Sequence, residues 1–340
     1  MRNWATRTAA LLILAGTLFI LAASSSASSR PPRRVTVMTR NLYLGANLLP
    51  IATAAPGAPF QRAVAGALAS VRRTGPTARM KLVAQEIAKA RPDLVGLQEV
   101  STWSTSRVGG SKVHLIVDYL RVIKAELRRL HAPYRVVAER LSLHLRAPSS
   151  TDTEVIFTDG NAILARSDVT VRDAHSGNFQ HQLTIPTQGI GKIVVTRSWN
   201  ALEATVHGAH FHFVNTHLEA YSSATRLQQA QELVKGPLKS ARQTILVGDL
   251  NSSANLPLAA DRPPFLAIRT AGFVDERTSQ PNCCLNDDLR TGKWDHIVDH
   301  VMARPRAKLV RSYLTGRETT GAGRRPSDHG GVVSVLALAH

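Results

Sequence analysis

The sequence predicts an α/β fold of the α+β kind: a four-layer α/β/β/α sandwich in which two mostly antiparallel sheets pack face to face between outer helices. Helix and strand patterns alternate over residues 35–138 and again over residues 210–302, and a strand-rich stretch without a clear helical period separates them. Two such stretches predict two packed sheets covered by helices. Antiparallel pairing should dominate, because many connections are too short for the helical crossovers that parallel neighbours need.

Length and composition fit one domain, which we place at residues 30–340. The chain has 340 residues and is 44% hydrophobic, enough for a sizeable core. Its formal net charge of +18 makes a polyanion a candidate partner, although a general arginine bias of the sequence explains the charge equally well. The two cysteines, Cys283 and Cys284, are neighbours, so no disulfide framework holds the fold. They either form a vicinal bridge or remain thiols, and we assign them no catalytic role.

The N-terminus has the pattern of a secretory signal, which we place at residues 1–29. Arg2 and Arg7 form its basic start, an apolar stretch covers residues 8–23, and small residues suited to cleavage near Ala27 follow. The apolar stretch is shorter than the ~20 residues that a membrane-spanning helix needs. We therefore expect an exported, soluble, extracellular protein.

The first half of the chain alternates strands with helices. Residues 50–76 are rich in Ala, Pro and Gly and predict a surface loop with at most a short helix. Thr77–Ala90 has the spacing of an amphipathic helix, which Arg91-Pro92 ends, and similar spacing predicts a longer helix over Ser111–Leu130. The strands expected here are Val35–Met38, Leu94–Leu97 and Tyr134–Ala138.

The second half contains mostly short strands between turns, and no internal repeat is visible. Helical spacing returns over Ala224–Val234 and, for a short helix, over Leu266–Ala271. The strands expected here are Val155–Phe157, Ala162–Arg166, Val169–Val171, Ile193–Thr196, Ala201–Val206, His210–Thr216, Thr244–Val247, Ile297–Met302, Leu309–Val310 and Val332–Leu336.

Polar residues follow several of these strands where the apolar run ends. Asp249 and Asn251 stand two apart after a buried strand, so in extended geometry their side chains point the same way. Together they can hold a phosphate, a water or a metal ion, although Gly-Asp-x-Asn is also ordinary turn chemistry. Glu99 ends another apolar run and would be a costly buried charge unless it is paired or bound to metal. Asn41, beyond the first strand, could orient it.

The C-terminal third adds acids and histidines. Neighbouring residues of a strand point to opposite faces, so Asp328 could bind a metal while His329 meets a phosphate, provided the loop turns there. Asp299 lies inside an apolar pattern and could hold a histidine in one tautomer; Asp295 is the alternative, and the hydrophobic register favours Asp299. His217 ends a further apolar run and is a candidate phosphate donor.

Other chemistries have less support. His210 and His212 would share a strand face, but no third ligand stands at a zinc-typical offset, so we do not expect zinc. The sequence contains no Gly-x-Ser-x-Gly elbow, phosphate-binding Gly-Lys loop or dinucleotide fingerprint. A serine hydrolase, a nucleotide-driven enzyme and a nicotinamide enzyme are therefore disfavoured.

Six short motifs stand in the order Asn41, Gln98-Glu99, Asn215-Thr216-His217-Leu218, Gly248-Asp249-Leu250-Asn251, Asp299 and Ser327-Asp328-His329. This order resembles the endonuclease/exonuclease/phosphatase superfamily and covers nearly the whole chain after the signal. The family includes deoxyribonuclease I, apurinic endonucleases, neutral sphingomyelinases and inositol polyphosphate 5-phosphatases, and its fold is the four-layer sandwich. The apurinic branch fits less well, because it tends to carry an acid at the place of Tyr43 and lacks a histidine at the place of His217.

The resemblance implies a metal site. Glu99 would hold Mg²⁺, with Asn41 and Asp328 in or near its coordination shell, and Mn²⁺ or Ca²⁺ could replace it. A Mg²⁺ held by few carboxylates keeps waters and an open position for a phosphoester, and positioned charge supplies most of the catalysis.

The resemblance also implies roles around the phosphate. Asp249 and Asn251 would position the phosphate and the attacking water or leaving group. His217 would donate to a phosphate oxygen, and His329, oriented by Asp299, would act in proton transfer or phosphate stabilisation.

The expected function is a secreted Mg²⁺-dependent phosphoesterase, with an endonuclease-like phosphodiesterase first and nucleic acid as its candidate partner. A sphingomyelinase or phospholipase C-like enzyme or an inositol-phosphate phosphatase is the alternative, and peripheral membrane contact through residues 50–76 stays open. A non-catalytic binding protein on the same scaffold is the third possibility. Asn161 is either a substrate-facing residue, as the family strand would have it, or part of a simple turn. No obligate protein partner is inferred.

Overall fold

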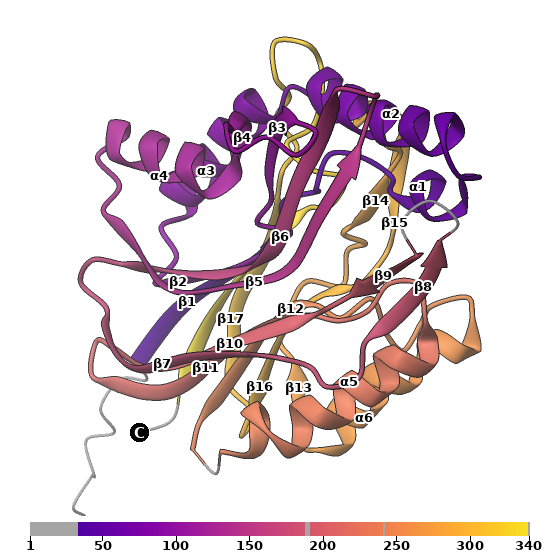
Figure 1. Ribbon diagram of the computed structural model, residues 1–340. Coiled ribbons are helices and arrows are strands. Elements are labelled where there is room, and N and C mark those ends of the chain that lie inside the picture. Colours follow the sequence, from indigo (N-terminus) through magenta and orange to yellow (C-terminus); the bar gives the residue numbers. More distant parts are fainter. Residues whose placement is uncertain (1–32, 188–190, 241, 339–340) are drawn as a thin grey trace, which may run out of the picture. The chain divides into compact units, whose positions relative to one another are not determined.

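The computed structural model describes residues 33–187, 191–240 and 242–338. The predicted secretory signal, residues 1–29, lies outside these residues, and both it and the domain boundary at residue 30 stay predictions. The described part contains six α-helices and two main sheets. Figure 1 shows the two sheets stacked on one another between the helices. The predicted four-layer α/β/β/α sandwich is confirmed.

The first sheet consists of β1 (Arg33–Asn41), β2 (Leu94–Gln98), β3 (Thr102–Arg107), β4 (His114–Asp118), β5 (Tyr134–Pro148), β6 (Thr153–Arg166), β17 (Lys308–Thr315) and β18 (Gly331–Leu338). The strand order is β17-β18-β1-β2-β6-β3-β4, and β5 pairs with β6. β1 and β2 are parallel, and the other neighbours are antiparallel.

The second sheet consists of β7 (Thr170–Asn178), β10 (Ser198–Val206), β11 (Ala209–His217), β12 (Thr244–Asp249), β13 (Val274–Asp275) and β16 (Asp299–Arg304). Its order is β13-β16-β12-β11-β10-β7, and β11 and β12 form its parallel pair. Two small hairpins lie beside the sheets: β8 (Leu183–Thr187) with β9 (Gly191–Val195), and β14 (Cys283–Leu285) with β15 (Gly292–His296).

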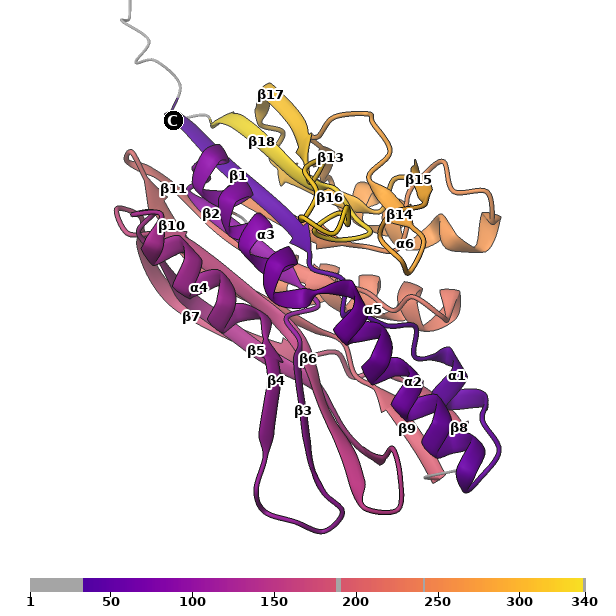
Figure 2. The ribbon, with the colours of Figure 1, turned by 90° about the horizontal axis from the view of Figure 1, so that it is seen from above.

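The helices are α1 (Leu49–Thr53), α2 (Ala58–Thr74), α3 (Pro76–Ala90), α4 (Tyr119–Arg129), α5 (Ser223–Lys235) and α6 (Pro263–Thr270). The first four accompany the first sheet, and α5 and α6 cover the second (Figure 1). Seen from above, α3 and α4 run beside each other across the first sheet (Figure 2). Among the described residues, no helix combines the length and apolarity needed to span a membrane.

Three apolar layers hold the sandwich together. Between the sheets, side chains such as Val37 and Ile163 meet Phe213 and Val247 of the second sheet, all fully buried. A second cluster joins the first sheet to α2, α3 and α4, and a third joins the second sheet to α5 and α6. Since burial of apolar area is the main favourable term in folding, these layers fix how far the strand ends can move.

The prediction for residues 50–76 was wrong, because most of this segment is the helices α1 and α2. α2 buries Phe60, Val64 and Leu68 on one face, a spacing of four residues that packs against the core. Two of the three glycines of this segment stand at the ends of α2, Gly57 at the N-cap and Gly75 at the C-cap with φ 64°, as expected for a C-terminal glycine, and Gly66 lies inside the helix. The possible membrane contact through residues 50–76 assumed a surface loop, and the structure has helices there.

The prediction of one helix over Ser111–Leu130 was also wrong in its first half. His114–Asp118 is strand β4, which pairs with β3. The helix starts only at Tyr119, where the Asp118 side chain accepts a hydrogen bond from the backbone N–H of Arg121 at 2.9 Å. An Asp at the N-cap satisfies a donor of the first turn and sets the helix start. Elsewhere, the two short strands expected between residues 155 and 166 are one strand, β6.

Two parallel pairs bring their carboxyl ends to one edge of the sandwich. In the first sheet Asn41 of β1 lies opposite Gln98 of β2. In the second sheet Asp249 of β12 lies between His217 of β11 and Asp299 of β16. The fold therefore gathers the polar residues that follow these strands.

Candidate active site

Asn41 links the two sheets at this edge. Its amide nitrogen donates to Glu99 Oε1 at 3.1 Å and to Asp249 Oδ2 at 3.0 Å. Its amide oxygen accepts from the backbone N–H of Tyr43 at 2.9 Å. The hydrogen bonds thus show Asn41 orienting two carboxylates, and its role as an oxygen ligand to a metal stays a prediction.

The backbone departs from extended geometry at the residues that carry these groups. Glu99 has φ 54°, Tyr43 φ 58° and Asn251 φ 47°, all in the left-handed region. The expected extended geometry of Asp249 and Asn251 is therefore wrong, since the chain turns between them, but both side chains still reach His217 Nε2, Asn251 Nδ2 at 3.2 Å and Asp249 Oδ2 at 3.5 Å. The Asp249 carboxylate accepts from Asn251 N at 2.8 Å instead. Left-handed conformations of non-glycine residues cost free energy and cluster at functional sites.

Three carboxylates crowd one side of the site. Burial, followed by the charges of Asp159 and Asp328, raises the pKa of Glu99 from its usual 4.5 to about 7. Burial also raises the pKa values of Asp159 and Asp328. Ser101 Oγ donates to Asp159 Oδ1 at 2.8 Å and Ser327 Oγ donates to Asp328 Oδ1 at 3.2 Å, but neither hydroxyl brings a positive charge. A buried carboxylate whose pKa is raised by burial and by neighbouring acids suits a divalent cation, which favours the ionised form of its oxygen ligands.

His329 and Asp299 form a second buried group next to these carboxylates. His329 Nδ1 lies 2.8 Å from Asp299 Oδ2, and Asp299 is fully buried. Burial alone would lower the pKa of His329, but the charges of Asp299 and Asp328 outweigh it and hold that pKa well above 6.5. The alternative partner, Asp295, is exposed and pairs with His296 instead. The structure therefore places Asp299, and not Asp295, at the histidine.

The second nitrogen of His329 points into the site. Nε2 lies 3.8 Å from Asp249 Oδ2 and 3.9 Å from Asp328 Oδ1. Burial and the nearby charge of Asp299 raise the pKa of Asp249. An imidazolium N–H beside carboxylates of raised pKa can donate to a phosphate oxygen or move a proton.

His217 is held as a neutral donor. Burial and the charge of Arg197 keep its pKa well below 6.5. Arg197, which can only donate, lies 3.2 Å from His217 Nδ1, and the amide nitrogen of Asn251, also a donor, lies 3.2 Å from Nε2. Nε2 also faces an acceptor, the Asp249 carboxylate, so we place the ring proton there. That nitrogen lies 3.5 Å from Asp249 Oδ2, and the neighbouring Asn251 amide donates to Leu218 O at 3.0 Å.

Asn161 makes a different set of hydrogen bonds from the other candidates. It is buried, and its amide nitrogen donates to Ser198 O at 2.8 Å and Ser198 Oγ at 3.1 Å, across the two sheets. None of its described hydrogen bonds reaches another candidate residue. The acid two residues earlier on β6, Asp159, is the one that lies beside Glu99.

The histidines that raised the question of zinc do not form a site. His210 Nδ1 contacts Thr205 Oγ1, whereas His212 lies between Glu203 Oε1 at 2.9 Å and Pro237 O at 3.0 Å. Within the part of the chain that the structure describes, neither belongs to a group of three potential metal ligands.

Sequence reasoning missed Arg197 and Asp159. Arg197 lies just before β10, and its Nε is 3.4 Å from the buried Glu219. Asp159 stands directly before the Gly-Asn of β6 and could have been found there, but the prediction named Asn161 of the same motif instead. No sequence signal marked Arg197, because its significance depends on His217 at the end of β11 and on Glu219 in the loop that follows.

Buried arginines fix the loops that carry the site. Arg79 of α3 donates to Leu42 O at 3.0 Å and to Pro326 O at 2.8 Å. Arg40 donates to His329 O at 2.5 Å and pairs with Glu86 at 3.1 Å. Because each guanidinium has several donors in fixed directions, one side chain can hold two loops in register.

A disulfide joins Cys283 and Cys284, so the vicinal bridge is formed. It lies against the site, because Cys283 Sγ is 3.4 Å and Cys284 Sγ 3.9 Å from His329 Nε2. The sequence did not indicate this contact.

Comparison with known proteins decides the family. The sequence profile described as the Endonuclease/Exonuclease/phosphatase family matches residues 64–329, well over half of the chain. The chain belongs to this family. Members of the endonuclease/exonuclease/phosphatase family are typically metal-dependent phosphoesterases, and this chain is a phosphoesterase of that family. No curated protein matches the chain.

Solved structures agree with the family fold. An endonuclease/exonuclease/phosphatase from Bacteroides vulgatus is 16% identical with a TM-score of 0.56, over 90% of this chain and 100% of that one. A mannosyl-6-phosphatase of Bacteroides thetaiotaomicron is 18% identical with a TM-score of 0.54, over 89% of this chain and 100% of that one. Truncated Caenorhabditis elegans TDP2 is 17% identical with a TM-score of 0.52, over 90% of this chain and 98% of that one. At such identities the likeness shows the fold.

Proposed function

We propose that the protein is a secreted, Mg²⁺-dependent phosphodiesterase that acts on nucleic acid in an endonuclease-like way. The observation that carries the phosphoesterase chemistry is the division of the site into two sides. Glu99, Asp159 and Asp328 form an acidic side, where burial raises all three pKa values and the charges of Asp159 and Asp328 raise that of Glu99 further. His217 and His329 form a donor side. A phosphate between a cation and N–H donors needs this arrangement.

The acidic side fits a hard divalent cation. Glu99 and Asp328 would hold Mg²⁺, or Mn²⁺ or Ca²⁺ in its place, because they supply ionisable oxygens whose mutual repulsion a cation would relieve. When bound, the ion would neutralise charge on the phosphate and polarise its phosphorus–oxygen bonds.

The protein's own groups supply positioning and proton transfer. His329, protonated and fixed through Nδ1 by Asp299, donates from Nε2 to a phosphoryl oxygen. Asp249, whose pKa is raised by burial and by the charge of Asp299, accepts a proton from the attacking water. His217 donates from Nε2 on the same side, held by Arg197 at Nδ1.

A basic rim beside the site supports a polyanionic substrate. We define the rim as Lys293, Arg317 and Arg325, which together with Trp294 line a hollow of about 370 Å³. Trp294 connects the rim to the site, because its Nε1 donates to Asp328 O at 2.8 Å. Basic side chains next to an aromatic ring suit a nucleic-acid backbone with stacked bases.

A phosphomonoesterase is the second candidate, and the structural likeness to a mannosyl-6-phosphatase favours it. A small sugar phosphate would need the two-sided site but not the basic rim. Loss of rim charge therefore separates the two candidates, since it should weaken action on DNA and leave a monoester unaffected.

The test is a substrate screen on the purified protein with and without EDTA. Plasmid DNA, RNA, sphingomyelin, inositol phosphates and mannose 6-phosphate are incubated with Mg²⁺, Mn²⁺ or Ca²⁺. We expect DNA cleavage that EDTA abolishes and that Asp249→Asn reduces at least 10²-fold. Release of phosphocholine or inorganic phosphate, with DNA intact, would select an alternative. Binding without turnover of any substrate would identify a non-catalytic protein.

Secretion is tested separately. Recovery of the protein from the culture medium with a new N-terminus near Ala27 is expected from the basic start, apolar stretch and small residues of 1–29. Retention in the cell with Met1 in place would contradict it.

A further inference from the structure

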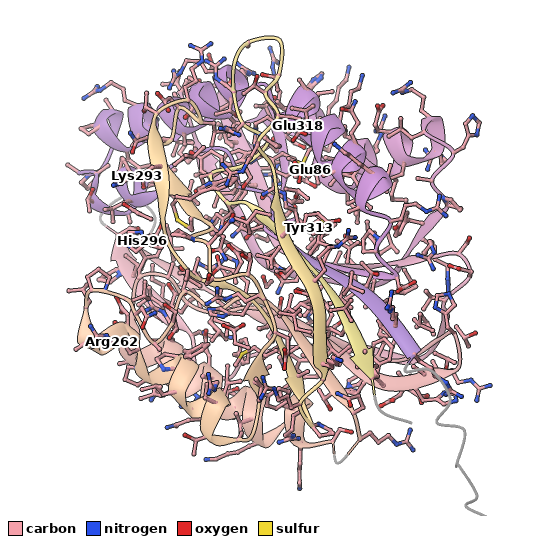
Figure 3. The ribbon with its side chains drawn as sticks, turned by 180° about the vertical axis from the view of Figure 1, so that it is seen from behind. Glu86, Arg262, Lys293, His296, Tyr313 and Glu318 are labelled. Atoms are coloured by element: carbon pink, nitrogen blue, oxygen red, sulfur yellow. A yellow bond between two sulfur atoms is a disulfide. The ribbon has the colours of Figure 1, made fainter. Side chains whose placement is uncertain are left out.

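The vicinal cysteines occupy a position that the phosphoesterase chemistry does not use. Cys283 is buried and Cys284 is exposed, and both sulfurs face the reactive nitrogen of His329. The hairpin of β14 and β15 holds them there, with Cys283 opposite His296. In Figure 3 this hairpin runs along one side of the molecule, marked by Lys293 and His296 on β15.

The two sulfur-to-nitrogen distances match a tetrahedral metal site, whereas the sulfurs are bonded to each other in the disulfide and must part on reduction. Zinc-type bonds of about 2.3 Å to sulfur and about 2.0 Å to nitrogen, at a tetrahedral angle, separate sulfur and nitrogen by about 3.5 Å. The two sulfurs lie 3.4 Å and 3.9 Å from His329 Nε2. Cys283, Cys284 and His329 form one of two groups of potential metal ligands in the described chain.

We propose that the reduced cysteine pair and His329 form a second metal site, which takes a thiophilic divalent cation such as Zn²⁺ or Cd²⁺. Two thiolates and one imidazole favour such cations over Mg²⁺, whereas the carboxylates at Glu99 favour Mg²⁺. The fourth position stays open to water, because Cys284 is at the surface.

The site is opened by reduction. A dithiol reductant gives two electrons and two protons to the disulfide; the Cys283–Cys284 bond breaks, two thiols form, and the reductant closes to its own disulfide. Binding of the cation then releases the two thiol protons to solvent. The oxidised pair offers no thiolate and leaves His329 Nε2 free.

Occupation of this site withdraws His329 from the phosphate, and this consequence rests on the proposed function. A cation bonded to Nε2 removes the N–H that would donate to a phosphoryl oxygen. Turnover of the reduced protein should therefore fall at least tenfold when Cd²⁺ binds and recover when the disulfide is restored. The oxidised protein should keep its activity at the same Cd²⁺ concentration.

The experiment measures binding independently of turnover. The full chain, oxidised or reduced with a dithiol and desalted without oxygen, is titrated with Cd²⁺ while the ultraviolet sulfur-to-cadmium charge-transfer band is recorded. We expect one Cd²⁺ per reduced chain and none per oxidised chain, with excess Mg²⁺ unable to displace it. Cys284→Ser, at an exposed position, should weaken the affinity strongly.

Two histidine variants identify the third ligand. His329→Gln should weaken Cd²⁺ binding by at least tenfold while the charge-transfer band persists. The matched control is His296→Gln, because His296 lies on the neighbouring strand and pairs with the exposed Asp295; it should leave the affinity unchanged. An effect of His296→Gln alone, equal binding to the oxidised chain, or no binding to the reduced chain would overturn the proposal. If the reduced protein binds Cd²⁺ as expected while the oxidised protein turns over no phosphoester, the result would instead contradict the proposed function.

Discussion

At the scale of single residues, the pair of Asp299 and His329 carries the sharpest prediction. Asp299→Asn removes the charge that keeps the pKa of His329 high and fixes its Nδ1 proton. We expect kcat to fall by about 10²–10³-fold. The pKa of His329, followed by its NMR titration, should drop, and the pH limb of kcat/KM that needs protonated His329 should move to lower pH.

Asp295→Asn is the control for this pair. Asp295 is exposed and pairs with His296, so its change removes an acid from the same strand region without touching His329. An equal loss of activity in both variants, with an unchanged His329 titration, would show that Asp299 acts only through the fold.

The raised pKa of Glu99 predicts that the stability of the folded protein depends on pH. Its pKa in the folded protein is about 7, above the usual 4.5, so the folded state holds a proton that the unfolded state releases between these values. The stability that this proton provides is fully present below pH 4.5 and is lost as the pH rises through about 7. Without metal, Tm should therefore decline over this range, and Mg²⁺ should restore it at the upper end.

Glu99→Gln should remove much of this decline, because glutamine does not titrate. Asp152→Asn, at an exposed acid in the turn between β5 and β6, should leave the decline intact. Calorimetry of the three metal-free proteins across pH 4.5 to 7 checks the result. A decline that persists undiminished in Glu99→Gln would assign it to other acids.

At the scale of elements, Gly96 sets the distance between the sheets beneath the site. A Cβ there would lie 2.5 Å from Asn215 Oδ1 and 2.5 Å from Val247 Cγ2. The same Asn215 oxygen accepts from Gln98 Nε2 at 2.6 Å, and the Asn215 amide donates to Leu97 O at 3.0 Å. Polar side chains thus join the sheets where the apolar layer ends.

Gly96→Ala should lower the free energy of unfolding by about 1–3 kcal/mol, because the methyl group must displace Asn215 or Val247. Gly66→Ala in α2 is the control: no atom lies within 4 Å of its Cβ position, and alanine favours a helix by about 1 kcal/mol. Urea unfolding of both variants gives the comparison. Equal midpoints would show that the sheets can separate without cost.

The elements that the sequence predicted well are those whose pattern is local. α3 and α5 have an apolar face that recurs at helical spacing. α3 begins one residue before its predicted start and ends where predicted, and α5 extends one residue beyond the prediction at each end. The helix α2 was not predicted, because its content of Ala, Pro and Gly resembled that of a loop. The strand β4 was not predicted, because its pairing with β3 is a non-local contact. A helix period cannot reveal a partner strand.

At the scale of the whole molecule, the sequence predicted those site residues that stand at the ends of strands. Asn41, His217 and Asp249 follow apolar runs, and parallel pairing brings them to one edge. Arg197 and the Cys283–Cys284 bridge act on the histidines only through tertiary contact. No spacing in the sequence encodes such contacts, so they had to come from the structure.

The net charge of +18 belongs to the whole molecule, and its effect on nucleic acid depends on where the charges lie. Each phosphate contact contributes about −0.9 to the slope of log affinity against log salt concentration for duplex DNA. Lys293 and Arg317 belong to the basic rim. In the Asp249→Asn background, where turnover is reduced, replacement of both by Ser should make the slope shallower by about 2. Fluorescence anisotropy of a labelled duplex between about 50 and 200 mM salt measures it.

The control removes the same charge elsewhere. Arg72 of α2 and Arg128 of α4 are exposed residues on the helices that cover the first sheet, and their double replacement by Ser lowers the net charge equally. If the rim makes the phosphate contacts, the slope should stay unchanged in this variant. If both double variants shift the slope alike, attraction comes from net charge and the rim does not guide DNA to the site, which would favour the small phosphomonoester as substrate.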